Sequence, residues 1–284
     1  MTRALDRLGA KWLRRTPTAV DATPLMKTQM LEIDGHRARV AVVGDGPLTV
    51  LALHGYPDTL QIFSRLALQV REGERLVAVD FPGQGHSEPR PTVVSPRERA
   101  AWLVKVLNAL NVGRVRALGH DMGAMSALML ASLAPERVER VVVMNALLSA
   151  TAPTSAVIWL LRWSSAHRVL LPAFPRSVVA RCCEDFLPAS TPLSAVVRED
   201  LEQAFTRPSV TATTVAVCDA AEKWLRRGVP MVTPPVLALW SRKGGHFPRE
   251  HAEVMPDAKI VEVEGGRHWL AWQSPELVWS HLVG

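Results

Sequence analysis

Tyrosine and cysteine are scarce in this 284-residue chain, and long apolar runs are absent. The cysteine count is low and odd, with Cys182 and Cys183 adjacent and Cys218 alone, which is not the pattern of a disulfide framework. No Cys/His spacing resembles a zinc site, so we expect no metal. No apolar run reaches the roughly 18–20 residues that a membrane helix needs, and residues 1–26 show no secretory pattern. We therefore expect a cytoplasmic protein without stable membrane insertion.

Positive charge is concentrated in residues 1–27. That segment holds six basic residues and two acidic ones, giving +4 of the net +6: Arg3, Arg7, Lys11, Arg14, Arg15 and Lys27 against Asp6 and Asp21. The remainder is close to neutral, which argues against a nucleic-acid partner. Leu5, Leu8, Trp12 and Leu13 lie near helical spacing and predict a basic amphipathic leader. Two interpretations stay open: a solvated helix packed loosely on the body, or a helix that touches a membrane surface or a partner.

The rest of the chain alternates short apolar runs with longer amphipathic segments. Val/Leu-rich runs of this length predict strands that are covered on both faces; they occupy residues 48–53, 76–79, 115–118, 141–144, 236–240 and 260–263. Ser95-Pro96-Arg97-Glu98 predicts a helix start with a capping box, and Ser274-Pro275-Glu276 predicts the last helix by the same chemistry. Residues 124–134 are apolar nearly all round, as in a central buried helix. This alternation predicts a doubly wound, mostly parallel α/β fold.

Residues 149–230 break the alternation, with no convincing strand and several prolines. We interpret them as a helical cap inserted between two parts of the core, residues 28–148 and 231–284. A cap in this place would cover the carboxyl ends of the strands, where α/β sheets bind ligands.

Three short motifs follow predicted strands. Gly119-His120-Asp121-Met122-Gly123 has the Gly-x-nucleophile-x-Gly pattern of a strained turn between strand and helix, and its carboxylate can attack carbon to form an ester. His54-Gly55-Tyr56-Pro57 places the backbone N–H of Tyr56 where it can join that of Met122 in an oxyanion hole. His268, on the loop after residues 260–263, is a candidate base for activating water. Each motif also has a plain structural interpretation: a tight turn, a strand-end turn and a surface histidine.

These motifs, together with the run Asp80–Ser87, resemble the α/β-hydrolase superfamily over residues 28–150 and 230–284. An aspartate at the elbow resembles the epoxide hydrolases and the haloalkane and haloacetate dehalogenases. His-Gly-Tyr-Pro is closer to the epoxide hydrolase and haloacetate dehalogenase pattern. The resemblance implies that Asp121 is the nucleophile, that His268 is the base and that Tyr56 and Met122 supply the oxyanion-hole amides.

The sequence departs from that family pattern at two places. Where an acid normally orients the histidine, Gly244 follows the seventh strand and Asn145 follows the sixth. Asn145 can accept the imidazole N–H through its carbonyl oxygen but supplies no charge; alternatively it is a turn residue. The cap contains no tyrosine. The residues that we expect to line a substrate pocket, unless they serve only in packing or face solvent, are Trp159, Trp163, His167 and Trp269.

The chemistry of these residues favours a hydrolase that acts on a neutral, largely apolar small molecule, without a cofactor. Met122 and Met125 beside the nucleophile offer neither an N–H for a halide nor a charge for a carboxylate. An epoxide hydrolase-like reaction through an Asp121 ester is the first hypothesis, and a dehalogenase-like hydrolase is the second. A third is a repurposed or inactive hydrolase fold that binds a small ligand or catalyses a non-hydrolytic step. The oligomeric state is left open.

Overall fold

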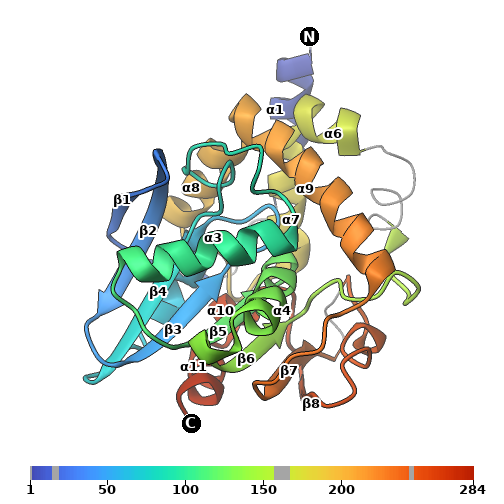
Figure 1. The fold of residues 1–284 in the computed structure, drawn as a ribbon. Coiled ribbons are helices and arrows are strands. Elements are labelled where there is room, and N and C mark those ends of the chain that lie inside the picture. The colour runs from blue at the N-terminus through green and yellow to red at the C-terminus, as the bar shows by residue number, and fades with distance from the viewer. Residues whose placement is uncertain (1, 15–18, 157–166, 243–245) are drawn as a thin grey trace.

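An eight-stranded sheet forms the centre of the protein in a computed structural model, which describes residues 2–14, 19–156, 167–242 and 246–284 (Figure 1). The strand order is β1-β2-β4-β3-β5-β6-β7-β8. The strands are β1 (Thr28–Ile33), β2 (His36–Gly44), β3 (Leu48–Leu53), β4 (Glu74–Val79), β5 (Val115–His120), β6 (Val138–Met144), β7 (Val236–Ser241) and β8 (Lys259–Val263). All six predicted strands are present, and β3 to β8 pair in parallel. The predicted α/β fold is confirmed.

Two strands were not predicted. β1 and β2 form an antiparallel hairpin, and β2 joins the sheet antiparallel to β4. The hairpin turns at Asp34 and Gly35, both with positive φ (50° and 75°). Most residues of β1 are exposed or half-buried, so its sequence mixes polar and apolar residues and contains no continuous apolar run. The strand was therefore not predicted.

Helices cover both faces of the sheet. α3 (Pro96–Ala109) and α4 (Met122–Leu133) pack on one face, and α2 (Ser64–Ala67), α10 (Leu270–Gln273) and α11 (Pro275–Val283) pack on the other. The predicted capping box is present: Ser95 Oγ accepts from Glu98 N (3.2 Å) and Glu98 Oε2 accepts from Ser95 N (2.9 Å). The prediction of an analogous capping box at Ser274 was wrong. Pro275 does open α11, but the Ser274 side chain makes no capping hydrogen bond.

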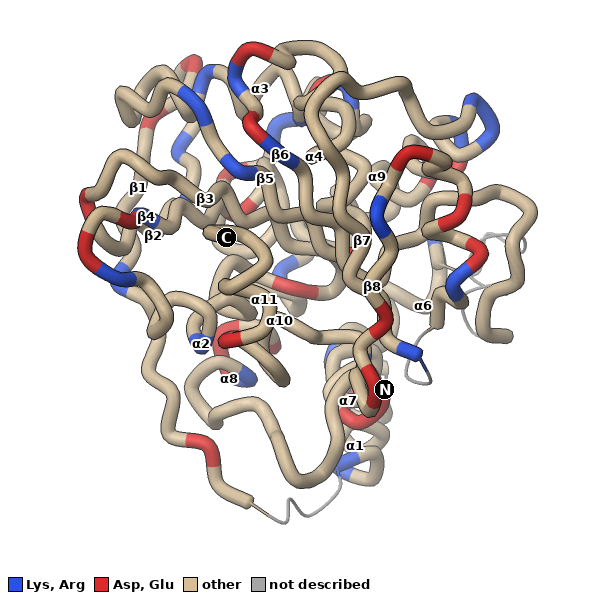
Figure 2. Tube along the Cα trace, turned by 90° about the horizontal axis from the view of Figure 1, so that it is seen from below, with Lys and Arg blue, Asp and Glu red and all other residues tan. Residues whose placement is uncertain are grey.

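Between β6 and β7, the described chain forms α6 (His167–Ala173), α7 (Pro175–Phe186), α8 (Ala195–Phe205) and α9 (Pro208–Arg227). These helices gather at one end of the sheet, and α1 (Thr2–Trp12) lies against α7 (Figures 1 and 2). Residues 2–12 form a helix, and the basic amphipathic leader over residues 1–27 stays a prediction. Whether residues 149–230 form a separate cap domain stays a prediction. No helix among the described residues is long and apolar enough to cross a membrane.

Candidate active site

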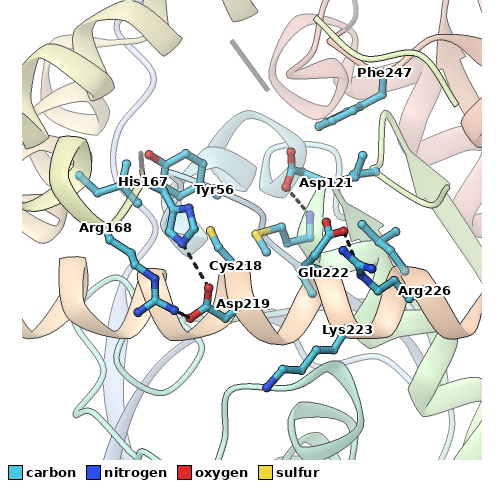
Figure 3. Close-up of a pocket in the computed structure, with 15 residues that line it drawn as sticks. Tyr56, Asp121, His167, Arg168, Cys218, Asp219, Glu222, Lys223, Arg226 and Phe247 are labelled. Carbon is cyan, nitrogen blue, oxygen red and sulfur yellow. Dashed lines mark hydrogen bonds and ion pairs between the residues drawn. The ribbon is translucent and has the colours of Figure 1, made fainter. Parts of the chain in front are cut away.

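Asp121 stands on a sharp turn between β5 and α4, with φ 51° and ψ −123°. This left-handed region is strained for a residue with a side chain, and such strain is concentrated at functional sites. The backbone N–H of Met122 donates to the Asp121 carboxylate (Figure 3). The N-terminus of α4, with its partial positive charge, therefore lies at the carboxylate.

Small residues make the turn possible. A Cβ on Gly123 would lie 2.2 Å from the carbonyl oxygen of Leu53, and one on Gly119 would lie 2.4 Å from the Cα of Ala124. A Cβ on Gly55 would lie 2.3 Å from the Cβ of Asp121 itself. The glycines of the two motifs thus let β3, β5 and α4 close around the carboxylate.

The predicted base lies next to the predicted nucleophile. His268 Nε2 is 3.3 Å from Asp121 Oδ2, and the imidazole is buried. Neither ring nitrogen of His268 makes a hydrogen bond within the described part of the chain, so the contact with Asp121 is close but not aligned as a hydrogen bond. The ring is held by packing, with ring centroids 4.2 Å from Phe186 and 4.5 Å from His120.

The predicted contact from Asn145 to the imidazole was wrong. Asn145 is buried after β6, but its amide nitrogen donates to the backbone oxygens of Arg267 (3.0 Å) and His268 (2.9 Å) and to Ser241 Oγ (2.8 Å). Its carbonyl oxygen accepts from the backbone N–H of Ser241 (2.9 Å), so it is occupied by β7. Asn145 holds the backbone of the histidine loop rather than its ring. Gly244, the other position considered for the acid, lies outside the described residues.

A second support for that loop was not predicted. Asp58, directly after the His-Gly-Tyr-Pro motif, is buried and lies 3.2 Å from His120 Nδ1. His120 Nε2 lies 3.1 Å from the backbone oxygen of His268. Trp269 Nε1 donates to Asp58 Oδ1 (2.9 Å), and the Gly55 N–H donates to Oδ2 (3.3 Å). Asp58 therefore ties together the three loops that carry the motifs.

The expectation that Trp269 lines a substrate pocket was wrong, because its indole N–H donates to Asp58. Its side chain is buried against Phe186, with ring centroids 5.1 Å apart, and does not line either cavity beside Asp121. The indole N–H needs a partner when buried, and Asp58 supplies it. Trp269 is a structural support for the histidine loop.

Two cavities meet at the nucleophile, with volumes of about 420 and 230 Å³. Both are lined by Tyr56, Asp121, Leu171 and Phe247. His246 and His268 also line the smaller cavity. The rest of its wall includes four apolar side chains: Leu170, Val178, Cys182 and Phe186. Its wall is almost wholly apolar. The larger cavity, shown in Figure 3, extends along α6 and α9.

Charged side chains border the larger cavity along α9. Asp219 accepts from Arg168 and lies 3.3 Å from His167 Nε2, and Glu222 pairs with Arg226 at 3.5 Å (Figure 3). His167 lines this cavity, with its Nε2 directed to Asp219, and a role for it in binding substrate stays a prediction. Trp159 and Trp163 lie outside the described residues. Trp224 packs in the core and does not line the cavity.

Tyr56, the only tyrosine of the chain, lies in both cavity walls. Its hydroxyl is buried and has no hydrogen-bond partner among the residues that the structure describes. Burial raises the pKa of this phenol well above its ordinary value, so the hydroxyl keeps its proton. The sequence had suggested only a role for the Tyr56 backbone.

Burial perturbs both central groups. Burial raises the pKa of Asp121 to about 6, although the nearby His120 and the Met122 N–H act in the opposite direction. Burial, and next the neighbouring His120, lower the pKa of His268 well below its ordinary value. At pH 7 the pair is therefore a carboxylate beside a neutral imidazole, which is the state that a nucleophile and a base require.

Comparisons with known proteins agree with this architecture. The family described as alpha/beta hydrolase fold matches residues 49–182. The acetyltransferase component of the acetoin cleaving system of Cupriavidus necator is 32% identical over 39% of this chain and 29% of its own length. Epoxide hydrolase 4 of Mus musculus is 24% identical over 95% of this chain and 83% of its own length. The match spans about a third of the length of the first curated relatives.

A solved structure gives the same result for the whole fold. The epoxide hydrolase CorEH superimposes with a TM-score of 0.72 at 18% sequence identity, covering 90% of this chain and 96% of that one. At this identity the likeness concerns the fold. The chain is therefore a protein of the alpha/beta-hydrolase fold, and it is similar within that fold to epoxide hydrolases.

Proposed function

We propose that the protein is a hydrolase that opens an epoxide through a covalent ester on Asp121. The observation that carries the proposal is the position of the Asp121 carboxylate: on a strained elbow, 3.3 Å from His268, where two cavities meet. A serine-type reaction has no nucleophile here, because the elbow residue is aspartate.

In the first step, a carboxylate oxygen of Asp121 attacks an epoxide carbon, the carbon–oxygen bond of the ring breaks and the oxygen takes a proton. We assign that proton to the Tyr56 hydroxyl, which is buried at the cavity wall without a partner among the described residues. In the second step His268 takes a proton from water as it attacks the ester carbonyl, and returns it to the departing alkoxide. The second proton of the water remains on the Asp121 carboxyl. Asp121 then releases it to solvent, and the Tyr56 phenolate takes up a proton from solvent, which restores both groups.

The cavities support a neutral, largely apolar substrate. Met122, Leu171 and Phe247 are among the apolar side chains that line the cavities, and the surface of the smaller cavity is almost wholly apolar. Because both cavities reach the same carboxylate, an epoxide bearing a substituent on each carbon fits the site: one group in each cavity. An anionic haloacid fits less well: of the cations that line the two cavities, Arg168, Arg181 and Arg226 each pair with an acidic side chain, and the Met122 side chain gives a halide no N–H donor.

Hydrolysis in ¹⁸O-labelled water tests the ester. During repeated turnovers, each ester hydrolysis places a solvent oxygen in the Asp121 carboxylate, so we expect the peptide containing Asp121 to gain label by mass spectrometry. The exposed Asp45 serves as the internal control and should gain none. A fully active enzyme with unlabelled Asp121 would exclude the covalent route.

The pH dependence follows from the raised pKa of Asp121. The carboxylate must be ionised to attack, so kcat/KM should rise with pH, reach half its maximum near pH 6 and stay level to about pH 8. His268 adds no second limb in that range, because its pKa is lowered and the ring is already neutral. Initial rates at low substrate concentration measure this profile. A half-maximum near pH 4 would contradict the burial of Asp121.

One observation favours a second candidate function. His268 Nδ1 is buried and has no hydrogen-bond partner among the described residues, so none of their carboxylates holds an imidazolium by a direct hydrogen bond; Asp58 favours the protonated ring only through space, and burial outweighs it and lowers the pKa of His268. This favours slow ester hydrolysis, as in a repurposed fold that binds a small apolar ligand. Measurable multiple turnover of any neutral epoxide would decide for the enzyme.

A further inference from the structure

α1 packs on the body through its polar side. Asp6 is buried, and its carboxylate accepts the backbone N–H groups of Arg176 (3.2 Å) and Ser177 (2.9 Å), in the first turn of α7. A Cβ on Gly9 would lie 2.7 Å from Ser177 Oγ, so Gly9 lets α1 approach α7 without displacing that hydroxyl. These contacts fix which side of α1 faces the protein.

The opposite side of α1 carries the apolar residues. Leu5, Leu8 and Trp12 are 51%, 53% and 87% exposed, and their spacing of three and four residues places them in one stripe. Val169 of the neighbouring α6 is 67% exposed as well. An amphipathic helix on a globular protein normally buries such a stripe. Here the hydrogen bonds from the N–H groups of Arg176 and Ser177 to the Asp6 carboxylate fix the orientation of α1, so that the apolar stripe faces outward.

A basic stripe runs beside the apolar one. Arg3, Arg7 and Lys11 follow one another at intervals of four residues and are exposed. None of the three forms an ion pair with a described residue. We call these six residues, Arg3, Leu5, Arg7, Leu8, Lys11 and Trp12, the outer face of α1. Figures 1 and 2 show α1 at the edge of the molecule, next to α6 and α7.

We propose that the outer face of α1 docks on the surface of an anionic lipid bilayer. In an interfacial helix, apolar side chains enter the boundary between headgroups and acyl chains while cations meet lipid phosphates. Tryptophan suits this depth because its ring is apolar and its N–H is polar. The adjacent apolar and unpaired basic stripes match that layered chemistry, which a purely apolar protein groove would not.

Docking in this orientation has a consequence for the cavity. α6 lies beside α1 and supplies His167, Arg168 and Leu171 to the larger cavity. The bilayer would therefore lie close to α6, the helix that borders the larger cavity. Neutral apolar molecules are concentrated in a bilayer, so they would be close to the cavity. The docking itself does not depend on the proposed reaction.

Vesicle co-sedimentation of the full chain tests the proposal. We expect about tenfold more binding to phosphatidylcholine vesicles with about 30 mol% phosphatidylglycerol than to phosphatidylcholine alone, and a large loss at about 1 M salt. Leu8→Ser/Trp12→Ser and Arg7→Gln/Lys11→Gln should each reduce binding about tenfold or more. Leu68→Ser is the matched control, since Leu68 is 63% exposed outside this face, and should bind like the wild type.

Circular dichroism and thermal unfolding establish that each variant is folded, so a lost fold is not mistaken for lost binding. Equal binding of wild type and Leu8→Ser/Trp12→Ser, or no preference for anionic vesicles, would overturn the proposal. So would a wild-type dimer in light scattering that Trp12→Ser converts to a monomer, because the face would then join two copies of the chain. Neither result bears on the Asp121 chemistry.

Discussion

Asp121→Asn is expected to lower kcat for epoxide hydrolysis by about 10⁴-fold or more. The substitution keeps the size of the side chain and an oxygen that can accept the Met122 N–H, but it removes the charged oxygen that attacks carbon. Steady-state turnover and mass spectrometry of the intact protein with excess substrate measure the effect. No adduct should form at residue 121.

The same substitution should stabilise the fold. A buried carboxyl whose pKa is raised to about 6 is more easily ionised in the unfolded chain, so the charge costs the folded state on the order of 2–3 kcal/mol at pH 7. The cost is present above pH 6 and disappears below about pH 4, where both states are protonated. Urea unfolding at pH 7 and at pH 4 should show a gain for Asp121→Asn only at pH 7.

The exposed residue Asp45 provides the matched control. Asp45→Asn removes the same charge from the turn between β2 and β3 and should change neither turnover nor stability beyond about 0.5 kcal/mol. Normal turnover by Asp121→Asn would refute the nucleophile. Loss of both turnover and stability would show that Asp121 serves the fold rather than the reaction.

Sequence patterns predicted the parts of the fold that are determined locally. A strand buried on both faces requires a continuous apolar run, so the core strands were visible from β3 to β8. β1 is an edge strand with little burial, so its sequence has no continuous apolar run. The available signal was Asp34-Gly35, a pair typical of two-residue hairpin turns, which β1 and β2 flank.

The sequence also placed Asp121 and His268 together, because both follow parallel strands whose carboxyl ends share one edge of the sheet. It did not predict what holds His268. The contact of Asp58 with His120 spans 62 residues, and that of Asn145 with the His268 carbonyl spans 123. Whether Asn145 reaches a ring or a backbone oxygen depends on side-chain rotamers and on Ser241, which no spacing encodes.

His268→Gln separates the two steps of the proposed reaction. Attack by Asp121 needs no base, so the ester should still form, whereas its hydrolysis should slow by about 10³-fold because no group takes the proton from water. Incubation with excess epoxide should therefore give one substrate mass on nearly every molecule, located by peptide mapping at Asp121. Asp121→Asn, by contrast, should stop before any adduct.

The matched control for this variant is His281→Gln in α11, which should turn over like the wild type and carry no more ester than the wild type does. His268→Gln with neither turnover nor adduct would contradict the assigned roles, since it would make His268 necessary for the attack itself. The wild-type protein gives a further comparison. Because His268 Nδ1 has no hydrogen-bond partner among the described residues, no directly bonded carboxylate supports the imidazolium during ester hydrolysis, and the ester should be a detectable fraction of the wild-type enzyme during turnover. A wild type with no detectable ester, beside a His268→Gln variant trapped as the ester, would show that a neutral imidazole held by its backbone and by Phe186 suffices as the base.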